Sequence, residues 1–184
     1  IHKMNLSEMF SLEGKVAVIT GGARHLGYDM AEILAEAGCD LVISSRKLAS
    51  AEKAAEELRK NLGRNVLPRV LDVTDPQQIE AFAEAASAWK GHVDILVNNA
   101  GGGSGLSPAH LFERSTKDMI EMITVNLVGA LLCCQAFAKK MAAQGSGKII
   151  NIASLLSFSG GIRATAYAAS KGGVGQLTKA LANE

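Results

Sequence analysis

Short apolar runs alternate along this chain with longer stretches in which hydrophobic residues recur at the spacing of an amphipathic helix. The runs are rich in valine, isoleucine and leucine, which is typical of strands buried on both faces. They predict strands at residues 16–19, 40–45, 66–71, 93–97 and 148–153. The amphipathic stretches predict helices at residues 26–37, 48–62, 115–143 and 166–181, with another helix starting at Thr74-Asp75-Pro76.

Turn-forming residues mark the ends of several of these elements. Gly38 and Gly63 follow the first two predicted helices, where glycine commonly ends a helix. A glycine- and serine-rich loop at 101–108 follows the fourth predicted strand. The alternation predicts a parallel sheet covered on both faces, which is a doubly wound, Rossmann-like α/β fold of three layers. We expect a single domain over residues 1–184, with ligands at the carboxyl ends of the strands.

Composition narrows the class of protein. The 19 Lys and Arg residues almost cancel the 18 Asp and Glu residues, so we expect no nucleic-acid or membrane partner. Three cysteines form no disulfide or metal pattern, so we expect no metal site and a reducing, cytoplasmic setting. The longest apolar stretch, 127–138, is interrupted by Gln135 and is too short to span a bilayer, which predicts a buried helix.

A glycine turn follows the first predicted strand, in the run Thr20-Gly21-Gly22-Ala23-Arg24-His25-Leu26-Gly27. Glycines between a strand and a helix let the backbone approach a pyrophosphate, which the helix N-terminus then stabilises. A tight turn without a ligand is the alternative, but the clear strand before it and helix after it favour a dinucleotide site. We expect five residues of the turn to bind the nucleotide: Gly21, Arg24, His25, Leu26 and Gly27.

The end of the second predicted strand indicates which dinucleotide binds. NAD sites place an acidic residue about twenty positions beyond the glycines, to pair with the ribose 2′-hydroxyl. This chain has Ser44-Ser45-Arg46 there, and an arginine suits the 2′-phosphate of NADP. Arg24 could reach the same phosphate. We therefore predict NADP as the cofactor, with NAD as the alternative, although Arg46 could also be only a solvated charge.

Tyr167 and Lys171 lie four residues apart, downstream of Ser154 at the end of the fifth predicted strand. On a helix the tyrosine and lysine share one face. Together a phenol, an ammonium and a hydroxyl could move a proton to or from a substrate oxygen. Taken singly, such residues more often pack or cap. Combined with a dinucleotide site, however, the set predicts hydride transfer.

With these pieces in order, the chain resembles the classical short-chain dehydrogenase/reductases from about Leu12 to its end. The opening at 10–16 and the glycine turn look most like the gluconate 5-dehydrogenase-like branch. The matching residues are the turn from Thr20 to Gly27, Asp72-Val73, Asn98-Asn99-Ala100-Gly101, Asn126, Ser154, and Tyr167 with Lys171.

The resemblance implies a catalytic role for four residues. Tyr167 would be the general acid in carbonyl reduction and the base in alcohol oxidation. Lys171 would stabilise the ionised tyrosine by its charge and hold the nicotinamide ribose. Ser154 would bind the substrate oxygen, and Asn126 would hold a water of a proton relay. The plainer alternative for Asn126 is a bond to neighbouring backbone.

The resemblance also implies contacts to the adenosine half of the cofactor. Asp72 would contact the adenine amino group, with Val73 beside the ring. Asn98, Ala100 and Gly101 would line the adenosine-ribose side and stabilise the sheet. A cap for the following turn is the alternative role of Asp72.

Two departures from the family pattern stand out. His25 occupies the middle glycine of the family's T-G-x-x-x-G-x-G turn. Histidine tolerates positive φ better than most residues, so we expect an outward imidazole beside Arg24 that helps to hold phosphate; weakened nucleotide binding is the alternative. The second departure is length, because the family continues beyond the tyrosine helix with two more strands, a helix and a substrate lid. The resemblance thus implies a chain truncated at its C-terminus.

We therefore expect an NADP(H)-dependent oxidoreductase that interconverts a secondary alcohol and a ketone, with a small polyol or sugar acid as its substrate. A 3-oxoacyl-thioester (acyl carrier protein) reductase and a nucleotide-sensing regulatory protein are the alternatives. No feature of the sequence favours a further possibility, a structural subunit of a larger assembly. The apolar helix around 126–141 could pack on a partner, as in the family's dimers and tetramers, which predicts a homo-oligomer such as a homotetramer. Burial within the same chain is an equal alternative.

Overall fold

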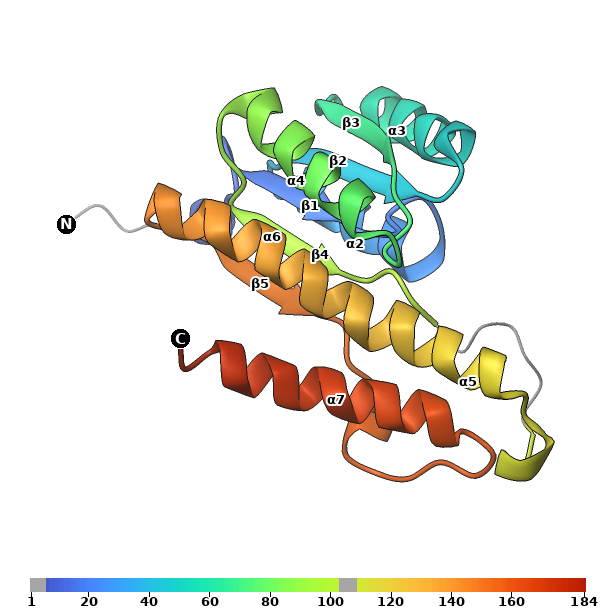
Figure 1. The fold of residues 1–184 in the computed structure, drawn as a ribbon. Helices are drawn as coiled ribbons and strands as arrows, with labels where there is room; N and C mark the ends of the chain where they lie inside the picture. The colour runs from blue at the N-terminus through green and yellow to red at the C-terminus, as the bar shows by residue number, and fades with distance from the viewer. Residues whose placement is uncertain (1–5, 103–108) are drawn as a thin grey trace.

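The computed structural model describes residues 6–102 and 109–184. Its centre is a five-stranded parallel sheet with the order β3-β2-β1-β4-β5 (Figure 1). This order confirms the doubly wound, Rossmann-like prediction. The strands are β1 (Val16–Ile19), β2 (Asp40–Ser45), β3 (Val66–Val70), β4 (Ile95–Asn98) and β5 (Lys148–Asn151).

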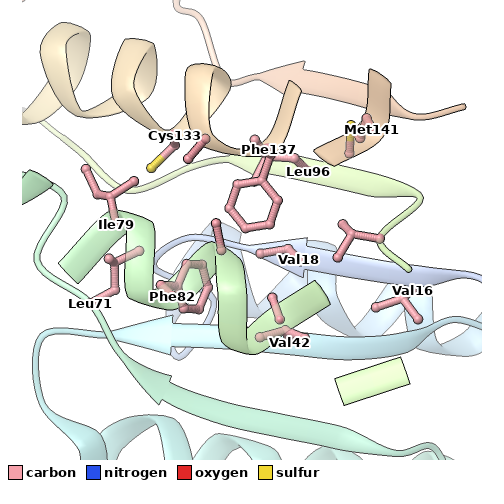
Figure 2. Close-up of a cluster of buried hydrophobic side chains, with 14 of the residues drawn as sticks. Val16, Val18, Val42, Leu71, Ile79, Phe82, Leu96, Cys133, Phe137 and Met141 are labelled. Atoms are coloured by element: carbon pink, nitrogen blue, oxygen red, sulfur yellow. The ribbon is translucent and has the colours of Figure 1, made fainter. Parts of the chain in front are cut away.

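Helices cover both faces of this sheet, as the three-layer prediction requires. The strands alternate their side chains, so that Val18 faces α4 and α6 while Ile19 faces α2 and α3. Figure 2 shows Phe82 of α4 and Phe137 of α6 in the hydrophobic cluster that contains Val18. The centroids of their two rings are 5.9 Å apart. The helices over the two faces are α2 (His25–Glu36) with α3 (Leu48–Leu62), and α4 (Pro76–Lys90) with α6 (Gly129–Gln144).

The predicted helix at 115–143 is a composite of three segments: α5 (Thr116–Ile123), a π-helical turn η2 (Thr124–Val128) and α6. Ser115 caps α5 by accepting a hydrogen bond from the amide of Asp118 (3.0 Å). By length and composition alone, the stretch Thr116–Gln144 could cross a bilayer. However, 44% of its most apolar window is buried within the fold, and Phe137 is fully buried. This packing agrees with the predicted core helix.

The last long helix, α7 (Thr165–Leu181), lies beside α5 and η2. Three short segments complete the structure: α1 (Leu6–Met9), η1 (Leu111–Glu113) and η3 (Leu155–Ser157). Most of the predicted loop at 101–108 lies outside the described residues. The predicted strand at 148–153 ends early, at Asn151. The next residue, Ile152, donates its amide to the carbonyl of Asn98 (3.0 Å), and its carbonyl accepts a hydrogen bond from the Lys171 ammonium.

The three cysteines are free and buried. Burial raises the pKa of Cys39 to about 11 and that of Cys133 to about 12. It also raises the pKa of Cys134. These thiols are therefore protonated at neutral pH and serve as packing residues.

Candidate active site

The site forms where β1 and β4 lie side by side, although α2, β2, α3, β3 and α4 separate them in the sequence. This is the point at which the strand order reverses, and ligands of such sheets bind there. The Thr20 hydroxyl accepts hydrogen bonds from the amides of Asn99 (3.1 Å) and Ala100 (3.0 Å). The Asn99 side chain in turn donates to the carbonyls of Thr20 (3.1 Å) and Gly21 (3.2 Å). These bonds hold the glycine turn against the segment after β4.

The glycine turn is too tightly packed for a side chain at Gly27. A β-carbon there would lie 2.2 Å from the carbonyl oxygen of Gly21 and 2.5 Å from the Asn99 amide nitrogen. His25 adopts a φ of 49°, a left-handed conformation that favours glycine. Its side chain is exposed, which agrees with the expected outward direction. A role in binding phosphate stays a prediction.

A basic cavity lies beside this turn, at the carboxyl end of β2. Its volume is about 770 Å³. Arg24 and Arg46 line it, as the 2′-phosphate hypothesis requires, together with Ser45. The structure adds Lys47 and Lys53 of the α3 region, which sequence reasoning missed because lysines at such positions look like an ordinary solvated helix face. Four cations around one cavity fit the chemistry of an NADP phosphate.

Asp72 and Val73 follow β3 but take part in local structure. The Oδ1 of Asp72 accepts hydrogen bonds from the amide (2.9 Å) and hydroxyl (2.7 Å) of Thr74. Asp72 therefore does cap the following turn, as the alternative role predicted, and it uses one of its two carboxylate oxygens to do so. Val73 is buried in the core against Gly129, where an added β-carbon would meet it at 2.8 Å. Their contacts to adenine stay predictions.

Asn98 ends β4 and is buried. Its amide nitrogen donates to Oδ1 of Asn151 on β5 (2.9 Å) and to the Cys134 sulfur on α6 (3.2 Å). The residue thus joins two strands and a helix, which is the sheet-stabilising role implied by the family. Its own Oδ1 is buried without a partner in the part of the chain that the structure describes.

Asn126 is buried within the π-helical turn. Its Oδ1 accepts from the amide of Gly102 (2.8 Å), and its Nδ2 donates to the Gly102 carbonyl (3.1 Å) and the Ser170 hydroxyl (3.1 Å). A β-carbon at Gly101 would lie 2.5 Å from this Oδ1. The bond to neighbouring backbone is therefore present, and it links the loop after β4 to α7. The water-relay role stays a prediction.

Lys171 reaches from α7 to the end of β5. Only 5% of the residue is exposed, and its ammonium donates to the carbonyl of Ile152 at 2.6 Å. Burial lowers the pKa of Lys171, because the charged form loses hydration. The lysine is thus anchored two residues before Ser154.

Ser154 caps the short η3 turn, where its hydroxyl accepts from the amide of Leu156 (3.2 Å). Its own amide donates to the hydroxyl of Ser157 (3.1 Å), and that hydroxyl donates to the carbonyl of Lys171 (2.7 Å). Ser157 was missed by sequence reasoning, because a serine in a serine-rich loop carries no distinguishing signal. Through these two hydrogen bonds, Ser157 connects the backbone of Ser154 to the backbone of Lys171.

Tyr167 lies on α7 one helical turn before Lys171 and is partly buried. It lines a second cavity, of about 190 Å³, between η1, α5 and the start of α7. The fold thus gathers the tyrosine, the lysine and the Ser154 loop around one end of α7. A phenol beside an open cavity can exchange a proton with a bound oxygen, and a nearby ammonium stabilises the resulting phenolate.

The chain is similar to known dehydrogenases and reductases. The model of the short chain dehydrogenase family matches residues 15–184. The 2-dehydro-3-deoxy-D-gluconate 5-dehydrogenase of Escherichia coli is 45% identical over 176 residues, covering 95% of this chain and 67% of that protein. The 3-oxoacyl-[acyl-carrier-protein] reductase FabG of Vibrio cholerae is more distant, at 36% identity, and the match covers 95% of this chain and 68% of that one.

A solved structure gives the same fold. A gluconate 5-dehydrogenase from Burkholderia cenocepacia, in complex with NADP and tartrate, superposes with a TM-score of 0.89 and is 38% identical. The match covers 96% of this chain and 68% of that one. The chain therefore spans about two thirds of the length of the proteins it matches.

Proposed function

This chain belongs to the short-chain dehydrogenase family, and from that premise we propose that it is an NADP(H)-dependent oxidoreductase interconverting a secondary alcohol and a ketone. When bound, the nicotinamide would supply or accept the hydride. The observation that carries the proposal is the placement of Tyr167 and Lys171 on one helix whose lysine is fixed to the end of β5, next to Ser154.

Each of the four catalytic candidates has a distinct part in this proposal. Tyr167 gives a proton to the substrate oxygen in reduction and removes it in oxidation. Lys171 stabilises the phenolate and would hold a ribose hydroxyl, and its burial would strengthen both interactions. Ser154 donates a hydrogen bond to the same substrate oxygen, and Asn126 fixes the adjoining loop through Gly102.

The basic cavity supports NADP over NAD. Arg24 and Arg46 would hold the 2′-phosphate, with Lys47 and Lys53 around them. The pyrophosphate would lie on the turn from Gly21 to Gly27, at the N-terminus of α2. NADP is also named in the Burkholderia complex.

The substrate we propose is a small sugar acid or polyol, because the Escherichia coli relative acts on a deoxy-gluconate. Reduction of a 3-oxoacyl thioester is the second candidate. The match to FabG supports it, at a lower identity than the match to the Escherichia coli relative. The protein would work in the cytoplasm as a homo-oligomer. Exposed apolar residues on the long helix support that assembly, namely Ile120, Val128 and Leu131.

The proposal is tested by following nicotinamide absorbance with NADPH or NADH, offering 5-ketogluconate and an acetoacetyl thioester in turn. We expect turnover of the ketoacid with NADPH. The Tyr167→Phe variant should lose about 100- to 10,000-fold in kcat while its nucleotide Kd stays unchanged. Tight nucleotide binding with no turnover of either ketone would favour the regulatory alternative, and equal activity of Tyr167→Phe would exclude the proposed acid.

A further inference from the structure

The small cavity beside Tyr167 differs in chemistry from the basic cavity at β2. It is about 190 Å³, which is room for a small organic molecule rather than a single water. Most of its wall is apolar and comes from α5, η1 and the start of α7, including Leu111, Met119 and Met122. Such a wall with few polar groups is typical of small-ligand sites.

Two arginines, Arg114 and Arg163, interrupt this apolar wall. None of the described residues that line the cavity is acidic. Arg163 makes no hydrogen bond or ion pair with any other described residue. A planar guanidinium at the edge of an apolar cavity matches the geometry of a carboxylate.

The backbone at Arg163 is itself unusual. Its φ of 58° is left-handed, a conformation that only one other non-glycine residue among those described adopts. Side chains disfavour this region, and such positions concentrate at ligand sites. The residue comes four positions before Tyr167, directly ahead of the first turn of α7. Arg163 and Tyr167 line the same cavity, so a cation lies near the proposed proton donor.

From these observations we infer that the cavity beside Tyr167 binds the carboxylate of the substrate, with Arg163 as the main recognition residue and Arg114 as the second. This inference rests on the proposed function and makes it more specific. It selects a hydroxy acid over a neutral polyol. A substrate held by its carboxylate at this point would present its hydroxyl or ketone oxygen to Tyr167.

The test compares two six-carbon substrates, D-gluconate and neutral D-sorbitol, with the NADP-loaded protein. The Arg163→Gln variant removes the charge and keeps a shorter, polar side chain. We expect its KM for gluconate to rise about 10- to 100-fold, the loss of a charge-assisted hydrogen bond, while kcat/KM for sorbitol stays within about twofold. Arg163→Lys should recover part of the loss. Lys60→Gln, in the last turn of α3, removes the same charge away from the site and should change neither substrate.

The outcomes separate this inference from the proposed function. An unchanged KM for gluconate in Arg163→Gln, or an equal loss for sorbitol, would overturn carboxylate recognition while leaving the oxidoreductase intact. If the wild-type protein turns over no alcohol, the proposed function fails. Calorimetric binding of gluconate to the NADP complex then decides the inference: weaker binding in Arg163→Gln upholds it, and equal or absent binding overturns it.

Discussion

The hydroxyl of Ser157 donates a hydrogen bond to the carbonyl oxygen of Lys171 at 2.7 Å. The same hydroxyl accepts from the amide of Ser154 at 3.1 Å. One serine outside the expected catalytic set therefore fixes the distance between the loop that carries Ser154 and the helix that carries Tyr167.

Removal of that hydroxyl should affect catalysis through position. We expect Ser157→Ala to lower kcat by roughly 10-fold, because small displacements of catalytic groups are costly. The nucleotide Kd should stay the same, and Ser157→Thr should restore most of kcat. Steady-state kinetics with NADPH would measure this split; an unchanged kcat in Ser157→Ala would show that the bridge has no positioning role.

The left-handed His25 leads to a prediction about nucleotide affinity. Glycine adopts a φ near 49° without strain, so His25→Gly should retain the turn while losing the imidazole. We expect the Kd for NADPH to change by a modest factor, about two- to fivefold, in fluorescence titrations. A complete loss of binding would contradict the outward orientation of the ring.

Arg46 should control the choice between NADPH and NADH. Its guanidinium lines the basic cavity, and a charge-assisted bond to the 2′-phosphate would be lost in Arg46→Gln. We expect the Kd for NADPH to rise about 10- to 100-fold and the Kd for NADH to stay nearly constant. Arg69→Gln, on β3, serves as the matched control. A parallel loss for both nucleotides would mean that Arg46 supports the fold and not the phosphate.

The buried charge of Lys171 should lower the free energy of unfolding at neutral pH. Burial lowers the pKa of Lys171 below its ordinary value of 10.5, so the unfolded chain holds this proton more tightly than the folded protein. The unfavourable contribution is present at neutral pH and disappears as the pH rises toward 10.5.

The corresponding measurement is thermal unfolding of Lys171→Met between pH 7 and 10. We expect the variant to have a Tm equal to or above that of the wild type at pH 7, with the difference shrinking as the pH rises, while its activity is lost. Lys179→Met, on an exposed position of the same helix, is the control. A variant that is less stable at pH 7 would show that the bond to Ile152 outweighs the cost of burial.

Local patterns were enough to predict much of the fold. Nearly continuous apolar strands between amphipathic helices specified a parallel, doubly wound sheet, because strands buried on both faces have no polar side. The glycine turn, Arg46, and the tyrosine and lysine four residues apart were readable because each depends on residues close together in the sequence. The helical region at 115–143 was predicted over nearly its full length, but nothing in an apolar helical pattern marks the π-helical turn at Asn126.

The sequence by itself therefore determined the fold class, the dinucleotide turn and the identity of the catalytic candidates. Tertiary structure decided which distant segments meet. It placed Lys171 on the carbonyl of Ile152, Asn126 on Gly102, Ser157 between two catalytic segments and Arg163 beside Tyr167. The physical reason is that strand and helix periodicity is set by neighbours along the chain, whereas these contacts arise only when packing of the helices on the sheet brings distant loops to one edge.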